Sequence, residues 1–276
     1  MESWRLILDP DLEGPENMAR DEAILRAADS GSKLPALPTL RVYGWASPTI
    51  SIGFVQNPSH LLGHGLPVVR RVTGGRAVLH DNELTYSIVV PSSNPLFLEG
   101  ITGAYSAISA CILKALKDIG ITASFSRGTP KGRSPQKDGC FFSASRYEIL
   151  VEGKKLVGSS QRRFRNAFLQ HGSILFGVNA GLNARLFGKG VVDRMSWIGA
   201  HSKAGRGDFR GMLVRRVSEG LGASFSPSGL TEQELYLRDS LMKAKYSSPL
   251  WNHSCARRFQ DIVRTVPSNG ERPEEE

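Results

Sequence analysis

A Gly-Gly pair flanked by arginines is the first feature of this sequence that could bind a ligand. It lies in residues 70–81 (RRVTGGRAVLHD), where Gly74 and Gly75 let the backbone approach a ligand closely and present its N–H groups. The neighbouring arginines, Arg71 and Arg76 among them, supply charge for a carboxylate, a phosphate or the surface of a protein carrier. The alternative is an ordinary Gly-Gly hairpin with exposed arginines.

Two more clusters combine polar residues with strand-like surroundings. In residues 153–161 (GKKLVGSSQ), a strand would point Lys154 and Lys155 to opposite faces, because successive side chains alternate. A lysine turned into an apolar sheet needs a reason, whereas a basic hairpin tip keeps both amines in water. In residues 169–174 (LQHGSI), His171 interrupts an apolar strand, and we interpret it as lining a pocket rather than acting as a base.

The three cysteines differ in their surroundings. Cys111, Cys140 and Cys255 are too few and too scattered for a disulfide framework, and none belongs to a motif with metal-ligand spacing, so we expect a reducing compartment and no metal site. Cys111 falls on a helical pattern and is predicted to be core. Cys140 follows a basic Gly/Ser/Pro-rich segment, residues 126–139, which we predict to be a mobile loop. Most cysteines of cytosolic proteins are inert, so this position alone does not make Cys140 a nucleophile.

The spacing of apolar residues predicts the helices and strands that must position these residues. Helical spacing marks residues 19–28, 102–119, 208–220 and 231–245, the last opening with a capping box at Thr231 and Glu234. Short β-branched runs at residues 40–46, 49–55 and 66–73 predict a strand meander, and two further strands flank residues 80–82. Residues 147–158 predict a hairpin turning at Glu152 and Gly153, and residues 168–177 another strand. We therefore predict one α+β domain, with helices on a mostly antiparallel or mixed β-sheet.

Composition narrows the possible partners and locations. Lys and Arg total 35 against 26 Asp and Glu, a net charge of +9, which favours acidic partners, of which nucleic acid is only one kind. No apolar stretch is long enough to span a membrane, and the first residues (MESWRLILDPDLEGPE) carry acids where a signal peptide needs a basic region and a long apolar run. We expect a cytoplasmic protein without membrane or nucleic-acid partners, ending in a solvated, disordered tail.

The three clusters, in this order, resemble a known family. Residues 69–87 (VRRVTGGRAVLHDNELTYS), 140–161 (CFFSASRYEILVEGKKLVGSSQ) and 169–174 (LQHGSI) are together similar to the lipoate ligases and octanoyltransferases of the biotin/lipoate protein ligase superfamily. Weaker matches extend the resemblance over residues 1–252. It implies a class II synthetase-like catalytic domain over residues 1–252 and leaves residues 253–276 as a polar tail.

The resemblance also implies the site. An acyl pocket would form between the Arg-Arg-x-Thr-Gly-Gly loop, the lysine strand and the Gln-His-Gly strand, with Lys155 as the family's functional lysine. The acyl- or substrate-binding residues that it implies are Arg71, Thr73, Gly74, Gly75, Arg76, His80, Gly158, Ser159, Gln161, His171 and Gly172.

Within the family, three features favour the cysteine-dependent transferase branch. Ligases usually have three glycines where this chain has Gly74, Gly75 and Arg76, and Arg76 would crowd a nucleotide. Ligases also commonly carry an accessory domain, for which the residues after Asn252 leave no room. Cys140, just before the Tyr-Glu strand, matches the position of the cysteine in the transferase branch.

The implied reaction is the first step of lipoate biosynthesis. Octanoyl would pass from octanoyl-acyl carrier protein to Cys140 as a thioester, and then to a lysine of a lipoyl-type carrier, either the glycine cleavage H protein or a 2-oxoacid dehydrogenase E2. Exchange between thioesters needs no ATP, and the Lys155 ammonium would favour the Cys140 thiolate. The oxyanion formed on transfer would need donors from Lys155 or the Gly74–Gly75 backbone. No cofactor is expected.

Three alternatives stay open. An ATP-dependent lipoate or octanoate ligase would need magnesium and could dispense with Cys140. An amidotransferase that moves the acyl group between carrier domains is a variant of the octanoyltransferase hypothesis. The Arg-Arg-x-Thr-Gly-Gly-Arg form disfavours it. A non-catalytic RNA-binding domain is disfavoured because no aromatic-rich RNA motif is present. Residues 188–211 match nothing that we can place, and Ser159-Ser160 stands where Ser-Ala is commoner in the family.

Overall fold

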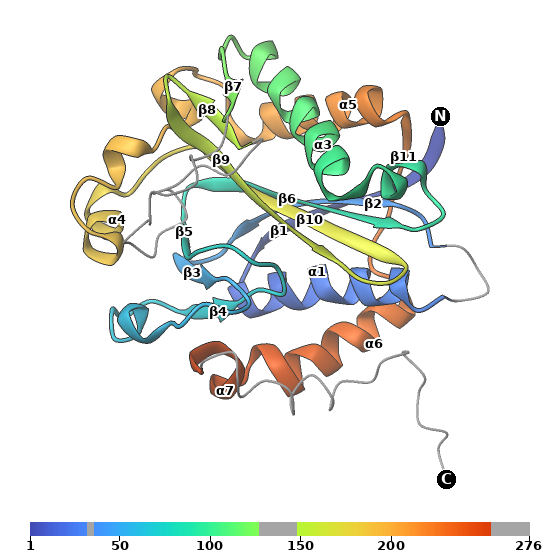
Figure 1. Cartoon of the computed structure of the whole chain (residues 1–276), viewed down its shortest axis with the longest axis horizontal. Helices are drawn as coiled ribbons and strands as arrows, with labels where there is room; N and C mark the ends of the chain where they lie inside the picture. Colours follow the sequence, from blue (N-terminus) through green and yellow to red (C-terminus); the bar gives the residue numbers. More distant parts are fainter. Residues whose placement is uncertain (32–35, 127–147, 255–276) are drawn as a thin grey trace.

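The main β-sheet spans the molecule and carries helices on both faces (Figure 1). The computed structural model describes residues 1–31, 36–126 and 148–254. In spatial order the strands of this sheet are β11 (Ala223–Pro227), β1 (Glu2–Leu12), β2 (Thr39–Trp45), β6 (Glu83–Pro91), β10 (Ala167–Leu175), β9 (Lys154–Arg163), β8 (Ile149–Val151) and β7 (Ser124–Phe125). The β11–β1 and β1–β2 pairs are parallel and the others antiparallel, so the predicted α+β class with a mixed, mostly antiparallel sheet is confirmed.

A second, smaller sheet holds the Gly-Gly loop. Its order is β4 (Val68–Arg70), β3 (Thr49–Ile52) and β5 (Val78–His80), with β3 and β4 parallel. The predicted meander is therefore wrong: β2 belongs to the main sheet, and the long connection from β3 to β4, with a 3₁₀ turn at Ser59–Leu61, returns the chain in the same direction. Asp81 and Asn82 carry the chain from β5 of one sheet to β6 of the other.

Two helix layers cover the main sheet. On one face lie α1 (Gly14–Asp29) and α6 (Glu232–Leu241), and on the other α3 (Gly100–Asp118) and α5 (Arg206–Leu221), as Figure 1 shows. The shorter helices are α2 (Pro95–Leu98), α4 (Ala180–Phe187) and α7 (Pro249–His253). Alternation along β10 separates the two cores, since Phe168 and Ile174 pack with α3 and Leu169 packs with α1. None of the described helices is long and apolar enough to cross a membrane.

Helix α6 has the capping box that its sequence predicts. The Thr231 hydroxyl accepts a hydrogen bond from the Glu234 N–H at 3.2 Å, and the Glu234 carboxylate accepts one from the Thr231 N–H at 2.7 Å. The helix continues into a π-helical turn, Met242–Tyr246, that turns Lys245 and Tyr246 into the interior. There the Lys245 ammonium donates to both oxygens of the buried Glu22 carboxylate, at 2.8 and 2.7 Å, and so ties this turn to α1.

The predicted hairpin between β8 and β9 is also present. Glu152 and Gly153 both have positive φ, 50° and 75°, as a type I′ turn requires. The resulting register leaves Lys154 exposed and buries Lys155, which is 2% exposed. The prediction of one inward and one outward lysine is thus confirmed.

Residues 188–211, which the sequence left unplaced, cover the lysine strand. They contain two short 3₁₀ turns, Val192–Arg194 and Ile198–Ala200. Between these turns, Met195 forms a β-bridge with Lys155, and the Ser196 N–H donates to the Lys155 carbonyl at 2.9 Å. This segment therefore holds the Lys155 backbone from a second side.

Breaking the Lys245–Glu22 pair tests the link between α1 and the C-terminal turn. Lys245→Met leaves a buried carboxylate short of a partner, and we expect the free energy of unfolding in urea to fall by about 3 kcal/mol, the lower end for such pairs because Arg26 still contacts Glu22. The exposed Lys243 is the matched control, and Lys243→Met should change stability by less than about 0.5 kcal/mol. Equal effects of the two substitutions would contradict this account.

Candidate active site

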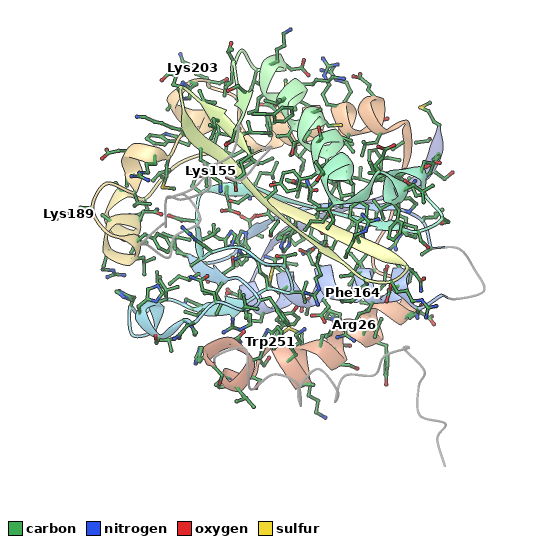
Figure 2. All side chains as sticks on the ribbon, in the orientation of Figure 1. Arg26, Lys155, Phe164, Lys189, Lys203 and Trp251 are labelled. Atoms are coloured by element: carbon green, nitrogen blue, oxygen red, sulfur yellow. The ribbon has the colours of Figure 1, made fainter. Side chains whose placement is uncertain are left out.

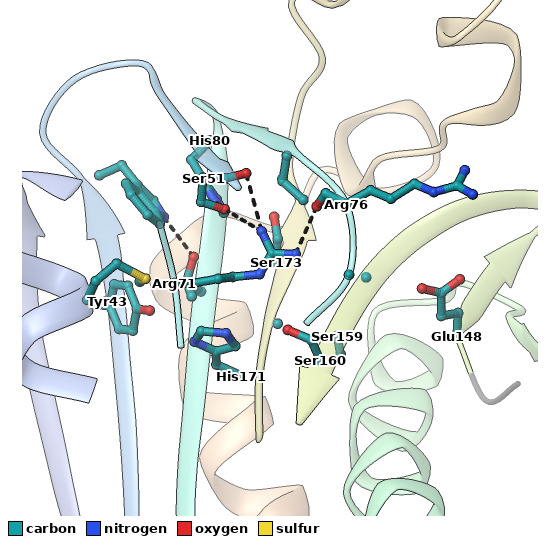
Figure 3. Close-up of a pocket in the computed structure, with 17 residues that line it drawn as sticks. Tyr43, Ser51, Arg71, Arg76, His80, Glu148, Ser159, Ser160, His171 and Ser173 are labelled. Carbon is teal, nitrogen blue, oxygen red and sulfur yellow. Dashed lines mark hydrogen bonds between the residues drawn. The ribbon is translucent and has the colours of Figure 1, made fainter. Parts of the chain in front are cut away.

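A pocket of about 280 Å³ lies where the small sheet meets strands β9 and β10 of the main sheet (Figure 3). Most of the binding residues expected from the sequence line it: Arg71, Gly75, Arg76, His80, Gly158, Ser159, His171 and Gly172. The lining residues that sequence reasoning missed are Met18, Tyr43, Trp45, Ser51, Val78, Thr85, Glu148, Ser160 and Ser173. The three motifs, distant in sequence, thus build one cavity.

The Arg71 guanidinium braces the glycine loop from inside. It is buried and donates to the carbonyls of Gly74 and Arg76, both at 2.8 Å, and to the carbonyl and hydroxyl of Ser51. Figure 3 shows the bonds to Arg76 and Ser51. A planar guanidinium can make these bonds in several directions at once. The reading of this motif as a hairpin with exposed arginines is therefore wrong for Arg71, and the loop is held in one shape.

Arg70 has a structural task. Its buried guanidinium donates to the carbonyls of Gly53, Phe54 and Gln56 and to those of Trp251 and Ser254. Trp251 returns a bond from its indole N–H to the Arg70 carbonyl at 2.9 Å. Helix α7 is thereby attached to β4, the strand that leads into the pocket loop.

Close backbone contact explains why glycine is needed in the loop. Gly75 has φ +92°, and a Cβ there would meet the Arg71 guanidinium at 2.9 Å. A Cβ on Gly53 would meet the Gly75 carbonyl oxygen at 1.9 Å. The Gly75 end of the loop therefore packs directly on the residue after β3, whereas a Cβ on Gly74 would meet open space.

His80 is fixed by a carboxylate and an aromatic ring. Its Nδ1 lies 2.9 Å from Glu83 and its Nε2 2.7 Å from the Ser51 hydroxyl, while its ring stacks on Trp45 at 3.8 Å. Burial alone raises the pKa of Glu83, but His80 and the hydroxyls of Ser173 and Thr85 outweigh it and hold that pKa below its usual value. Glu83 is thus an ionised, fully hydrogen-bonded anchor for this wall of the pocket.

His171 stands at the centre of a second network. Its Nδ1 lies 2.9 Å from the Asp21 carboxylate and its Nε2 2.7 Å from the Thr73 hydroxyl, which in turn accepts from the Ser160 hydroxyl at 2.8 Å. Ser160 is the cross-strand neighbour of His171 on β9. Burial lowers the pKa of His171 despite the opposing effect of Asp21, so its imidazole is neutral at neutral pH.

Gly172 lines the pocket at a position with no space for a side chain. A Cβ at this position would meet the Ser159 hydroxyl at 2.4 Å, the Tyr86 ring at 2.7 Å and the Gly158 carbonyl at 2.9 Å. The Ser159 and Tyr86 hydroxyls are hydrogen-bonded at 2.7 Å, and burial raises the pKa of Tyr86 to about 12. Any side chain at Gly172 would break this arrangement.

Lys155 lies on β9 beside the pocket (Figure 2). Its ammonium donates to Glu148 at 2.5 Å, and both side chains are buried. Glu148 itself lines the pocket, so this ion pair places the predicted functional lysine one residue behind the cavity wall. A buried pair of this kind holds both charges in fixed positions.

The remaining site predictions have mixed outcomes. Thr73 and Gly74 support the wall through their hydrogen bonds without lining the pocket, and Gln161 lies further along β9, where it bonds Gln170. Cys140, the predicted nucleophile, lies outside the described residues, as do Cys255 and the predicted loop after Ser126. Cys111 is buried in the core as predicted, and burial raises its pKa to about 11. The described residues contain no cluster of three His, Cys, Asp or Glu side chains that could hold a metal ion.

The fold and the pocket define a class of catalytic domain. The lipoyl protein ligase A/B catalytic-domain model matches residues 13–207, and the chain belongs to this family, as its motifs predict. Proteins named octanoyltransferase LipM are similar to the chain over most of its length. That of Kyrpidia tusciae is 40% identical, covering 92% of this chain and 99% of its own, and that of Brevibacillus brevis is 36% identical, covering 91% and 99%.

Solved structures agree on the fold. Protein Ta0514 of T. acidophilum, determined with bound lipoic acid, superimposes with a TM-score of 0.75 at 25% identity, covering 92% of this chain and all of that one. A lipoate-protein ligase A bound with ATP gives a TM-score of 0.76, also at 25% identity, and covers 92% of this chain and 99% of its own. The predicted superfamily and catalytic-domain fold are therefore confirmed.

The buried histidine should make stability depend on pH in a defined direction. Because the pKa of His171 is lowered in the folded protein, the unfolded chain takes up a proton below pH 6.5 that the folded protein does not, so the free energy of unfolding falls as the pH drops below that value. His171→Asn removes this contribution. Urea titrations between about pH 5 and pH 7 should show a shallower pH slope in the variant, by at most about 1.4 kcal/mol per pH unit. Parallel slopes for the two proteins would contradict a neutral, buried His171.

Proposed function

We propose that this chain transfers an octanoyl group from a thioester donor to a lysine of a lipoyl-type carrier domain, an early step of lipoate biosynthesis. The observation that carries the proposal is the match to octanoyltransferases over 92% of this chain, whose three family motifs meet in one pocket. The apolar side chains of that pocket, Met18, Trp45 and Val78, provide a surface for an alkyl chain, and its polar wall faces the reacting group.

The donor is octanoyl-acyl carrier protein and the nucleophile is Cys140. The Cys140 thiolate attacks the thioester carbonyl, a new C–S bond forms and the carrier's thiol leaves, so the acyl group stays activated throughout. The amine of the acceptor lysine then attacks the octanoyl-enzyme, a C–N bond replaces the C–S bond, and Cys140 is regenerated. Lys155 and the N–H groups of the Gly74–Gly75 loop supply positive charge and donors for the oxyanions of both steps.

No ATP enters this scheme, which separates it from the second candidate. A lipoate or octanoate ligase would adenylate a free acid, and the likeness to the ATP-bound lipoate-protein ligase A makes that reaction compatible with the fold. Arg76 on the pocket wall, where ligases usually have glycine, favours the transferase.

Both partners are protein carriers with an acidic character. The net charge of +9 and the exposed Arg162 and Arg165, at the turn between β9 and β10, support attraction to such carriers. The acceptor is a lipoyl domain of a 2-oxoacid dehydrogenase E2 or the glycine cleavage H protein.

Intact-protein mass spectrometry distinguishes transferase from ligase. After mixing with octanoyl-acyl carrier protein without ATP, the wild-type enzyme should gain one octanoyl group and Cys140→Ser should gain none. Adding an apo-lipoyl domain should discharge the adduct and octanoylate one lysine of that domain. Modification of the lipoyl domain only when octanoic acid, ATP and magnesium are supplied, with Cys140→Ser fully active, would identify a ligase.

The adjacent lysines provide a matched pair of variants for the charge at the site. Lys155→Met removes the inward ammonium, and we expect the rate of octanoyl-enzyme formation to fall by about 10²-fold or more. Lys154→Met removes the same charge from the exposed side of the strand and should keep the rate within about twofold. Because Lys155→Met leaves Glu148 buried without its ammonium, Lys155→Met combined with Glu148→Gln serves as the folding control. A Lys155 double variant that folds and acylates normally would remove Lys155 from the mechanism.

A further inference from the structure

Four side chains form a directed chain of hydrogen bonds that ends at the pocket. Asp21 on α1 contacts His171 on β10, His171 contacts Thr73 in the Gly-Gly loop, and Thr73 contacts Ser160 on β9. The three distances are 2.9, 2.7 and 2.8 Å. Asp21 and Thr73 are buried, while His171 and Ser160 line the cavity. The chain therefore joins a buried carboxylate to the pocket surface.

The direction of each hydrogen bond follows from the Asp21 end. Asp21 accepts from the Arg41 guanidinium at 2.7 Å and from the Tyr43 hydroxyl at 2.9 Å, and its pKa is lowered despite burial, chiefly by Arg41, so it is ionised. An ionised carboxylate only accepts, so His171 carries its hydrogen on Nδ1 and its Nε2 accepts from Thr73. Thr73 then accepts from Ser160, and the Ser160 oxygen presents only lone pairs to the pocket.

The hydroxyls of Ser173 and Thr85 also direct their hydrogens away from the pocket. Ser173 and Thr85 both donate to the Glu83 carboxylate at 2.5 Å, which also turns their hydrogens inward. Both residues line the same pocket as Ser160, and the Thr85 oxygen also accepts from the Trp45 indole N–H at 2.9 Å. The Ser160 and Ser173 oxygens consequently present acceptors to the cavity, and this part of its wall fits a substrate group that donates hydrogen bonds.

Among the reacting groups of the proposed function, the amine of the acceptor lysine is the strong hydrogen-bond donor, whereas the Cys140 thiol donates only weakly. A thioester carbonyl and sulfur can only accept, whereas the amine of the acceptor lysine donates and must lose a proton to become an amide. Resting on that function, we propose that Ser160 receives the attacking amine and that the Ser160–Thr73–His171–Asp21 chain takes up its proton. Ser160 is the member that contacts the substrate, and the other three act through it.

The proton transfer balances without any additional reactant. As the amine nitrogen bonds to the thioester carbon, its proton passes to the Ser160 oxygen, the Ser160 proton to Thr73, and the Thr73 proton to Nε2 of His171. The resulting imidazolium is paired with Asp21. When the C–S bond breaks, its electron pair goes to the cysteine sulfur, and the imidazolium returns its proton to that thiolate or to solvent.

The charges around His171 are consistent with a group that is neutral at rest. Asp21 of α1 favours its protonation. In β2, Arg41 donates to the other oxygen of that carboxylate and Tyr43 donates to the same oxygen as His171. Arg71 and His80, from the small sheet, oppose protonation. On the strands beside β10, Ser160 and Ser87 lie directly across from His171 and carry no charge, and the nearest acid of β6, Glu83, is already paired with His80.

The test compares a substitution of Thr73 that removes the hydroxyl with one that keeps it. Thr73→Val keeps the shape and removes the hydroxyl, and Thr73→Ser keeps the hydroxyl. Wild-type enzyme and variants are first loaded with octanoyl from octanoyl-acyl carrier protein, then mixed with apo-lipoyl domain, and discharge is followed by mass spectrometry from about pH 5 to pH 9. Ser87→Ala is the matched control, because Ser87 is the β6 neighbour of His171 and its buried hydroxyl has no hydrogen-bond partner among the described residues.

The proposal predicts that Thr73→Val lowers the rate of discharge relative to loading by about 10²-fold, and that Thr73→Ser restores it to within about fivefold. In the wild type, discharge should also show an additional acid limb as His171 becomes protonated, and this limb should be absent from Thr73→Val. Ser87→Ala should match the wild type in both respects.

Other outcomes separate the possible errors. Equal losses of loading and discharge in Thr73→Val, or equal losses in Thr73→Val and Thr73→Ser, would mean that Thr73 only supports the loop and would overturn the proposal. A wild-type pH profile in Thr73→Val would do so as well. If the wild-type enzyme never forms an octanoyl adduct, it is the octanoyltransferase function that fails. Should Thr73→Val not fold, Ser160→Ala interrupts the same chain at the pocket surface and is read by the same ratio.

Discussion

The buried Asp21 carboxylate is the point on which the architecture of the site depends. It lies on α1, 1% exposed, and accepts from Arg41, Tyr43 and His171, which belong to two strands of the main sheet. Leaving such a charge without partners inside a protein would be strongly unfavourable, so its three donors fix helix and strands relative to one another. The same contacts set which nitrogen of His171 carries hydrogen. Packing and the chemical character of the pocket thus have one common origin.

The adjacent arginines of the Gly-Gly motif divide the work of holding the loop. Arg71 turns inward and bonds the loop carbonyls from the pocket side, whereas Arg70 turns to the opposite side of β4 and bonds the end of β3 and helix α7. Alternation along the strand produces this division. Both arginines donate mainly to backbone carbonyl oxygens, and both are buried, so they order the loop rather than face solvent.

Much of this arrangement could be predicted from the sequence, for identifiable reasons. Strict alternation marked β6, a I′ turn at Glu152 and Gly153 set the register that buries Lys155, and a capping box marked the start of α6. Strand β1 escaped prediction because it is interrupted by Asp9, Pro10 and Asp11, and its parallel pairing with β2 and β11 depends on partners distant in sequence. The role of Asp21 was missed for the same reason, since 150 positions separate it from His171. Local pattern predicts elements, and such tertiary pairs remain beyond it.

Trp45, which stacks on His80 in the pocket, is a fluorescent side chain at the site. The chain has four tryptophans, at positions 4, 45, 197 and 251, and only that at position 45 lines the pocket. Trp4 is buried in a different core cluster, and Trp251 is buried in the same cluster as Trp45 without lining the pocket. An acyl chain entering the cavity would contact the Trp45 indole and none of the other three. Intrinsic fluorescence is therefore a local signal of occupancy, built into the protein without any added label.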